Sequence, residues 1–585
     1  MTGGETALRC FDLRTGETYW EISPDPTPST FSIFGVAAAP WQLEYSGGAG
    51  EVPGGEAQFG IGVSLVAIGG GRLLKLDPWS GVVTLNASIS PLTDGTYYRN
   101  GYALSVQSTN PYWPFSGPPP QYYLINWTTL APTISFMAAP VYNFTASVWN
   151  NITWPLGDAF TVAYDFEAGI AAAVDVQTPP GTGIWHGTSI RAVSLKTGAS
   201  LWNKTVEDTN YSPMCALADH GKVAFLTMGG YWLAYNLNDG SLAWKSDVMD
   251  YPWDATGFGA YASASAYGLF YRNAYSGVYA FNWTNGKIVW KFSANAPYEY
   301  ETPYVTPDGI TVYSFNGGGL LADGKYFVYN TEHTPTQPLT RGWRLFCLDA
   351  NTGENIWNVT GSIAVGAVFG MAGAAAVADG YLIGTNSYDG YMYCFGKGRS
   401  QTTVSASPEV IAKGSSVLIK GTVLDQSPSQ PGTPCVSKES MTTQMEYLHM
   451  QHPIDGVGGD AVITGVPVTL TAVDQDGDWI DIGTVTTDGY YGAFGLAWTP
   501  PEEGTYKIIA SFESDESYGS SGASTFVTVG PAPAEVEEVD LAPLESSVSD
   551  VEDNLSNQTT YIMIILVLVI IAIVIAVYSM LKPRK

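Results

Sequence analysis

The sequence predicts an all-β protein that combines a β-propeller, a β-sandwich and one membrane-spanning helix. Three observations carry this prediction. A motif repeats at the spacing of propeller blades between residues 1 and 400, seven short strands alternate between 401 and 530, and an uncharged apolar run stands near the C-terminus. At 585 residues the chain is too long for one hydrophobic core, and we expect it to divide into domains.

The repeated motif is a hairpin that ends on tryptophan. In its clearest copy Asn282 ends an apolar run, Gly286 turns the chain, and Trp290 closes a second apolar run. Alternating apolar residues on both sides of an Asn-Gly, Asp-Gly or Thr-Gly turn are typical of a β-hairpin. The same frame begins at Asp12, Ser194, Asn236 and Asp349 and ends on Trp20, Trp202, Trp244 and Trp357.

Weaker copies fill the gaps between the clear ones. One runs from Asp77 to Leu85, a second from Asn126 to Ile134, and a partial copy at 393–396 lacks its second half. Successive copies begin 42 to 68 residues apart, and the shortest spacings match a four-stranded propeller blade. Such repeats bury their faces only by stacking or by closing into a ring. The region 1–400 is therefore predicted to be a β-propeller.

Two short units predict individual blade strands. They lie at 214–218, 222–228, 232–237 and 242–245 in one unit and at 261–266, 268–274, 278–283 and 288–292 in the next. Longer units carry inserts rich in Pro, Gly and Tyr at 112–120 and 298–303, which we expect on the rim, where binding surfaces form.

The number of blades is open between seven and eight. If 18–22 supplies the outer strand that the last unit lacks, the ring closes with seven blades and no open edge. If the hairpin at 8–22 belongs to a blade of its own, there are eight. No export signal precedes the first copy, so we expect further sequence upstream of Met1.

The copies at Asp12 and Asp349, with Thr-Gly in the turn and Trp20 or Trp357 at the end, resemble the PQQ repeat of quinoprotein-like propellers, whose pattern is Ala-x-Asp-x-x-Thr-Gly-x-x-x-Trp. The resemblance implies a quinoprotein-like propeller in which each tryptophan docks onto the neighbouring blade. It implies no cofactor, because the same repeats build enzymes and scaffolds. The residues given this docking role are Trp20, Trp202, Trp244, Trp290 and Trp357.

Residues 401–530 are predicted to form a β-sandwich. Its strands are expected at 402–405, 416–424, 466–473, 480–485, 492–498, 506–512 and 524–529. The stretch 499–506 resembles the turn and strand start of immunoglobulin-like surface modules, which implies an Ig-like domain. The insert 426–462 is expected to be a long loop or a small subdomain.

The C-terminal part predicts a membrane anchor. Residues 531–560 are acidic and poor in apolar residues, and we expect a disordered stalk. Residues 561–581 carry no charge and are long enough to cross a hydrocarbon layer of about 30 Å. The basic tail 582–585 predicts a cytoplasmic C-terminus, so the region before 561 is expected outside the cell.

Charge and sequons agree with that placement. The chain has 25 Lys+Arg against 54 Asp+Glu, and its net charge of −29 argues against nucleic-acid binding, which needs a basic surface. Asn-x-Ser/Thr sequons, which are typical of exported chains, begin at Asn86, Asn126, Asn143, Asn151, Asn203, Asn210, Asn282, Asn358, Asn554 and Asn557.

Candidate chemistry is sparse. Cys10, Cys347 and Cys394 share one slot of the repeat and are expected to be small core residues, although a Cys394–Cys435 disulfide is an alternative. His449 and His452 form a loose metal pattern, and 474–478 is interpreted as a turn rather than a calcium loop. We therefore assign no catalytic, cofactor-binding or metal-binding residue. The adjacent cysteines that the quinoprotein resemblance would lead one to expect over a quinone are missing.

The leading functional hypothesis is a single-pass surface protein, not an enzyme, whose propeller binds an extracellular protein or glycan without a cofactor. One alternative is a membrane-anchored PQQ-dependent oxidoreductase, which retention of quinone by the purified protein would favour. Another is a structural component of a bacterial or archaeal envelope lattice, which ordered self-assembly would favour.

Overall fold

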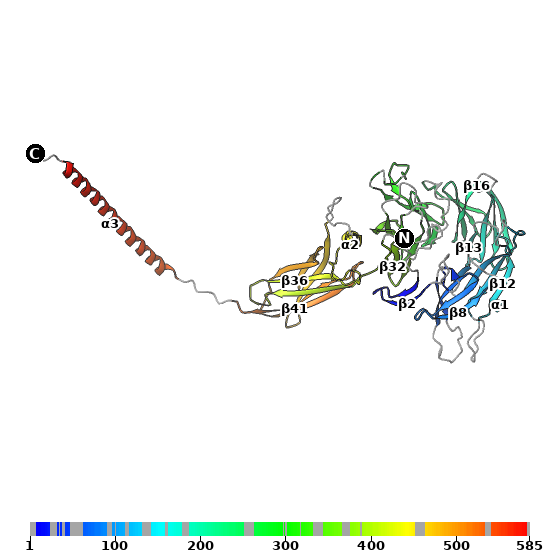
Figure 1. Cartoon of the computed structure of the whole chain (residues 1–585), viewed down its shortest axis with the longest axis horizontal. Coiled ribbons are helices and arrows are strands. Elements are labelled where there is room, and N and C mark those ends of the chain that lie inside the picture. Colours follow the sequence, from blue (N-terminus) through cyan, green and yellow to red (C-terminus); the bar gives the residue numbers. More distant parts are fainter. Residues whose placement is uncertain are drawn as a thin grey trace.

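The computed structural model describes residues 7–23, 32–33, 36–37, 41–46, 62–89, 96–99, 101–110, 116–130, 142–157, 162–177, 186–250, 263–296, 298, 301–302, 304–315, 317–330, 343–365, 375–386, 389–450, 462–532 and 540–581. Its fold is mostly β. Figure 1 shows a propeller-type region, a β-sandwich and a single C-terminal helix following one another along the chain.

The propeller-type region is a series of antiparallel sheets in which neighbours in sequence are usually neighbours in the sheet. The first is a hairpin of β1 (Leu8–Phe11) and β2 (Thr18–Ile22), and a short pair of β3 (Ser32–Ile33) and β4 (Val36–Ala37) follows. The next two sheets have four strands each: β5 (Gln42–Ser46), β6 (Gly62–Gly69), β7 (Arg72–Leu76) and β8 (Val83–Ser88), then β9 (Thr96–Arg99), β10 (Tyr102–Ser108), β11 (Tyr122–Thr128) and β12 (Val148–Thr153), with the short helix α1 (Phe144–Ser147) before β12.

A long strand joins the following two units. They comprise β13 (Val162–Asp165), β14 (Ile170–Gln177), β15 (His186–Ser194), β16 (Ser200–Asp219), β17 (Lys222–Thr227), β18 (Trp232–Asn236) and β19 (Leu242–Lys245). The first part of β16 pairs with β15 and its last part with β17, so β16 is the outer strand of one unit and the inner strand of the next.

The last units complete the series. They are β20 (Ser263–Ala266), β21 (Leu269–Ala274), β22 (Gly277–Asn282) and β23 (Ile288–Phe292), the pair β24 (Ala294–Asn295) and β25 (Val312–Tyr313), then β26 (Gly319–Ala322), β27 (Lys325–Tyr329), β28 (Arg344–Asp349) and β29 (Asn355–Thr360), and finally β30 (Ile363–Ala364), β31 (Ala376–Ala378), β32 (Tyr381–Asn386) and β33 (Met392–Phe395). The strands predicted within 214–245 and 261–292 all lie within two residues of strands found here, with β16 extending further toward the N-terminus.

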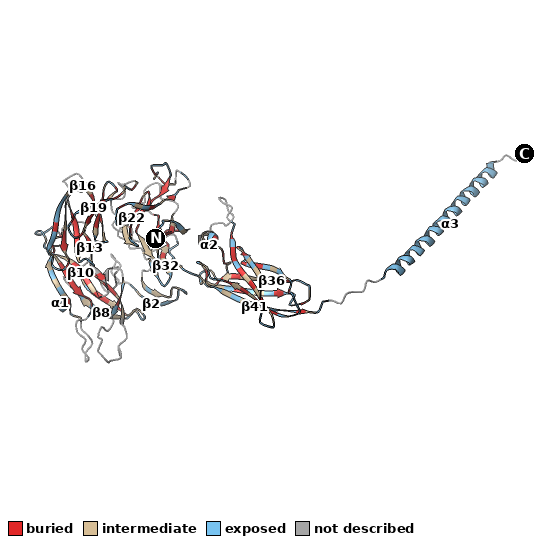
Figure 2. Cartoon of the chain, turned by 180° about the vertical axis from the view of Figure 1, so that it is seen from behind, coloured by how far each residue is buried: buried red, intermediate tan, exposed pale blue. Residues whose placement is uncertain are grey.

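Hydrophobic cores lie between neighbouring units. One buried cluster joins Trp232 and Trp244 of one sheet to Phe270, Phe281 and Trp283 of the next. Because each sheet buries one face against its neighbour, the units depend on one another, as stacked repeats do. Buried positions follow this series of sheets in Figure 2.

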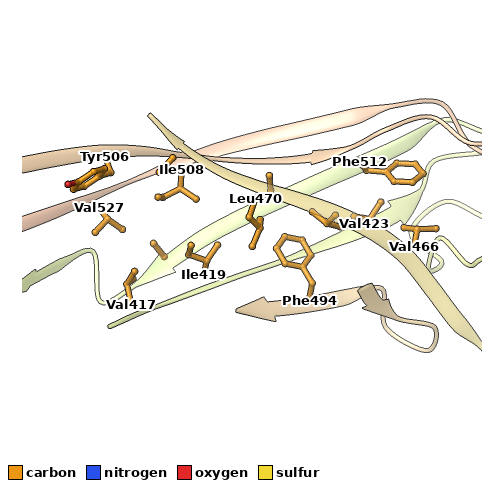
Figure 3. Close-up of a cluster of buried hydrophobic side chains, with 14 of the residues drawn as sticks. Val417, Ile419, Val423, Val466, Leu470, Phe494, Tyr506, Ile508, Phe512 and Val527 are labelled. Carbon is orange, nitrogen blue, oxygen red and sulfur yellow. The ribbon is translucent and has the colours of Figure 1, made fainter. Parts of the chain in front are cut away.

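The β-sandwich consists of a three-stranded sheet that packs against a five-stranded sheet. The first holds β34 (Ser400–Ser407), β36 (Val417–Asp425) and β39 (Ala493–Trp498); the second holds β35 (Val410–Ala412), β41 (Ser521–Gly530), β40 (Gly504–Phe512), β37 (Thr464–Val473) and β38 (Trp479–Asp488). Figure 3 shows side chains of both sheets, among them Ile419, Phe494, Leu470 and Ile508, meeting in one core. Each of the seven expected strands overlaps one found here.

The insert of the sandwich contains a helix that binds the propeller-type region. This helix, α2 (Lys438–Met450), places Glu446 against Arg344 of β28 at 2.5 Å. Glu446 also accepts a hydrogen bond from the Thr360 hydroxyl at 2.7 Å, and Thr442 donates to the main-chain oxygen of Asn358 at 2.7 Å. The insert is thus a docking element that connects the two domains.

The C-terminal helix α3 (Ala542–Leu581) is long and apolar enough to span a membrane, and its whole length is exposed (Figure 2). The expected disordered stalk is wrong for residues 542–560, which are helical. An acidic stretch that continues an apolar helix needs no new nucleus, and adding residues to an existing helix costs little. The basic tail 582–585 lies outside the described residues.

Candidate interaction surface

The repeated motif forms a turn that its first polar residue stabilises. Asp349 accepts hydrogen bonds from the backbone N–H groups of Asn351 and Thr352 at 2.9 and 2.8 Å, and Gly353 donates its N–H back to the Asp349 carbonyl at 2.8 Å. These backbone donors, that of Thr352 first, lower the pKa of the Asp349 carboxyl. The copies at Asp12 and Asp77 make the same turn.

Four of the five predicted tryptophans make one and the same contact with the next unit. The indole N–H of each donates to the main-chain oxygen of the residue that follows the first polar residue of the next motif. The pairs are Trp20 to Pro78 at 3.0 Å, Trp202 to Leu237 at 2.6 Å, Trp244 to Trp283 at 2.9 Å and Trp290 to Ala350 at 3.0 Å. This geometry is what a docking role requires.

The same tryptophans explain why the turn of the next motif requires a glycine. Gly286 has a φ of +70°, and a Cβ there would lie 2.5 Å from Cε3 of Trp244. The glycine therefore serves both the turn and the close approach of the indole. Gly81, Gly240 and Gly353 lie equally close to Trp20, Trp202 and Trp290.

The fifth tryptophan and the weak copies differ from this pattern. Trp357 is half-buried and stacks on Phe395 of β33 with ring centroids 5.4 Å apart. Leu85 occupies the docking position in β8, opposite Lys75, as predicted.

The copy placed at Asn126 to Ile134 is wrong. The strand register puts Asn150 of β12 in the docking position, opposite Asn126, and Asn150 donates to the Lys196 oxygen at 2.7 Å. An insertion that includes α1 separates the third strand from the outer one, so the sequence spacing no longer locates the turn.

The N-terminal hairpin lies between the last unit and the first four-stranded one. On one side Trp20 donates to Pro78; on the other, Arg14 forms an ion pair with Asp379 at 2.6 Å, and the Cys394 thiol donates to the Leu13 oxygen at 3.2 Å. β2 pairs with β1, and no described strand pairs with the outer edge of β33.

Tyrosines gather on the rim opposite to the motif turns. In an antiparallel four-stranded unit, the turn between the second and third strands and the connection to the next unit lie at the same end. Tyr231, Tyr275 and Tyr391 lie in such turns, and Tyr298 and Tyr304 lie in the connection between β23 and β26. We call these five residues the tyrosine rim.

The tyrosine rim combines anchored and exposed rings. Tyr275 and Tyr304 contact each other with centroids 4.6 Å apart, and the Lys245 ammonium lies 3.9 Å over the Tyr231 ring. Tyr298 and Tyr391 are 57 % and 71 % exposed. The connection that carries Tyr298 and Tyr304 also contains Phe315, which is fully buried in the core between two units. Residues 112–115 of the other predicted rim insert lie outside the described residues.

The cysteines, the histidine pair and the 474–478 turn that the sequence singled out are the remaining candidates for chemistry. All five cysteines are free: Cys347 and Cys435 are buried, whereas Cys394 is exposed, contrary to the core role expected for it. His449 bonds Gln430 at 2.8 Å, and burial lowers the pKa of its imidazole. His452 lies outside the described residues. Asp474 accepts bonds from the N–H groups of Asp476 and Asp478, which is the hydrogen bonding of a turn.

Comparison with known proteins gives structural likeness alone. Neither a protein-family model nor a curated protein matches the sequence. Among solved structures, BamB from Moraxella catarrhalis has 11% identity, a TM-score of 0.27, and coverage of 62% of this chain and 82% of its own. The C-terminal WD40 domain of Sif2 has 9% identity, a TM-score of 0.32, and coverage of 57% and 77%. The computationally designed Ika8 protein has 10% identity, a TM-score of 0.31, and coverage of 58% and 94%.

The propeller-type organisation rests on the strand order and on the repeated tryptophan contacts described above.

Proposed function

We propose that this protein is a membrane-anchored scaffold that binds an extracellular protein or glycan through the tyrosine rim. The observation that carries the proposal is the pair of exposed rings, Tyr298 and Tyr391, on the same end of tightly docked units. Tyrosine offers a large rigid surface together with a hydroxyl, and it is enriched where proteins bind partners.

Rigidity of the surrounding units supports this role. The turns that carry Tyr231 and Tyr275 belong to strands whose opposite ends are fixed by the tryptophan contacts of Trp202 and Trp244, so this part of the rim needs little ordering when a partner binds. The apolar part of α3 followed by the basic tail supports an anchor with an outside N-terminal region and a cytoplasmic C-terminus.

Two finer points of architecture belong to the same proposal. We infer eight blade positions, because the β1–β2 hairpin contacts the last unit through Leu13 and the first four-stranded one through Trp20, as a blade of its own would. We also infer an Ig-like sandwich, which the two facing sheets and the 499–506 turn favour.

Binding by the soluble region tests the proposal. A fragment ending near residue 532 is applied to arrays of surface glycans and of extracellular proteins, and each hit is measured again with Tyr298→Ala plus Tyr391→Ala. We expect the double substitution to weaken binding at least tenfold. Trp79→Ala is the matched control, because Trp79 is 81 % exposed on the motif-turn side and its loss should change nothing. Equal effects of the two variants would contradict a role for the rim.

A second assay separates the scaffold from the quinoprotein alternative. The full-length protein is incubated with pyrroloquinoline quinone and calcium, and bound quinone and dye reduction with alcohols and sugars are measured. A quinone must be held and its carbonyl polarised before it can accept hydride. We expect no retained quinone and no turnover; stoichiometric quinone with turnover would replace the scaffold by an oxidoreductase.

A further inference from the structure

Each outer strand carries one residue in an equivalent place, directly after the docking position. We call this place the edge slot. Because side chains alternate along a strand, a residue in the slot lies on the face opposite to the docking side chain. In the strands that the structure describes, the edge slots hold Glu21, Asn86, Asn151, Asn203, Lys245, Lys291 and Asn358.

An outer strand is an edge that another chain can pair with, and proteins protect such edges with charge or cover. Three slots hold charged residues: Glu21 pairs with Arg9, Lys291 pairs with Asp250 at 2.5 Å, and Lys245 lies over Tyr231. A fourth slot, Asn358, lies under α2, whose Thr442 bonds the Asn358 main chain. Four of these slots therefore hold a charge or lie under a cover.

The other three slots hold neutral asparagines in consecutive units, and each begins a sequon. These are Asn86-Ala87-Ser88 in β8, Asn151-Ile152-Thr153 in β12 and Asn203-Lys204-Thr205 in β16. All three asparagines are exposed, and each sequon lies in extended strand. Asn86 accepts a hydrogen bond from Arg72 through its amide oxygen, a bond that does not engage the amide nitrogen.

We propose that Asn86, Asn151 and Asn203 carry N-linked glycans that protect the outer edges of these three units. The inference rests on the proposed extracellular placement. The amide nitrogen forms a bond to the sugar C1 and loses one proton, while the bond from C1 to the phosphate of a lipid-pyrophosphate-linked oligosaccharide breaks and the lipid pyrophosphate leaves. A bulky hydrated chain on the strand face blocks pairing with a second copy, as Lys245 and Lys291 do by charge.

Two other sequons of the same region serve as matched negative sites. Asn126 is 9 % exposed, its Nδ2 atom is buried, and its Oδ1 atom accepts a hydrogen bond from Tyr102. Asn358 occupies an edge slot, yet its side chain is half-buried, whereas those of the three proposed sites are exposed, and α2 covers its main chain. Sequence alone ranks these two equally with the three proposed sites.

Glycopeptide mass spectrometry of the full chain, made in an N-glycosylating host and recovered from the membrane fraction, tests the sites. We expect glycans at Asn86, Asn151 and Asn203 and none at Asn126 or Asn358. Ser88→Ala, Thr153→Ala and Thr205→Ala should each remove one glycan while leaving the asparagine in place. Equal occupancy at Asn126 or Asn358 would overturn the edge-slot account.

Protease treatment of the same intact cells separates the two possible failures. An exposed chain that lacks glycans at all three slots would overturn this inference and leave the proposed location standing. A protected chain without glycans would overturn both.

The protective role has its own test. A variant with Asn86→Gln, Asn151→Gln and Asn203→Gln is compared with a variant in which the same three asparagines are replaced by lysine. Both variants lack the three glycans. We expect the Gln variant to lose at least half of its monomer to aggregates on size-exclusion chromatography and the Lys variant to keep it. Equal monomer fractions would contradict protection of the edges.

Discussion

Trp244 and Glu44 each join two neighbouring units, but they do so by different chemistry. Trp244 inserts an indole between units, donates to the Trp283 oxygen and covers Gly286. Glu44 of β5 is a carboxylate, only 1 % exposed, that pairs with Lys75 in its own sheet and reaches across to Thr129 and to the Tyr98 hydroxyl of the next unit, the last at 2.7 Å.

The comparison shows how a unit boundary can be held without a docking tryptophan. A unit boundary without a docking tryptophan, such as the one that follows Leu85, is held by a buried polar network in addition to apolar contacts. The two solutions differ in tolerance, because an apolar contact weakens gradually whereas a buried charge that loses its partner is strongly unfavourable.

The largest effect is expected at the tryptophan interface. Trp244→Ala should lower the free energy of unfolding by about 4 kcal/mol, since it removes a buried ring and leaves a cavity between two units. Trp79→Ala, at an exposed ring, should cost under about 1 kcal/mol in the same urea titration. Similar losses for both would mean that the docking frame is misassigned.

At the polar interface, Glu44→Gln should cost about 3 kcal/mol, because Lys75 then lies nearly buried without its counter-charge. The double variant Glu44→Gln plus Lys75→Met removes the unpaired charge and should recover part of that loss. Urea unfolding measures both. A double variant less stable than the single one would show that the ion pair is not what makes this boundary sensitive.

Asn150 sharpens the comparison, because it stands in the docking position without a ring. Asn150→Ala should cost about 1 kcal/mol, the usual value for one hydrogen bond, here to the Lys196 oxygen. A thermal unfolding shift as large as that of Trp244→Ala would show that docking does not depend on the indole.

The smallest effect is a pH dependence beside Trp244. Hydrogen bonds from Lys287 and from the Ile288 N–H lower the pKa of Asp247 below its ordinary 3.8. This stabilisation is present above pH 3.8 and is lost as pH falls through the lowered folded-state pKa. Asp247→Asn should cost under about 1 kcal/mol at pH 7, and the cost should shrink as the pH falls below 3.8. A cost that is independent of pH would exclude the charge as its cause.

Sequence reasoning predicted those features of the fold that depend on the spacing of residues close together in the chain. The motif turn with its glycine and the strands of 214–245 and 261–292 follow from residues a few positions apart, which is why Gly286 was recognisable as a turn residue and Trp244 as the end of a hairpin. The sandwich strands followed from alternation in the same way.

What sequence reasoning missed depends on contacts between distant residues. Nothing near Glu44 in the sequence indicates Thr129, and the insertion before β12 displaced the docking position from 134 to Asn150. The helix α2 was expected as a loop or subdomain, and its role comes from Glu446 meeting Arg344, about a hundred positions earlier in the chain. The edge slots likewise became visible only when strand registers aligned the outer strands.

Topology in the membrane is the claim on which both the proposed scaffold and the glycans depend. Protease added to intact cells, followed by mass spectrometry of the released material, tests it most directly. We expect a soluble fragment that contains the propeller-type region and the sandwich, cut between the end of β41 at Gly530 and the start of α3 at Ala542. Full protection of that region in intact cells, with cleavage only after lysis, would contradict the account.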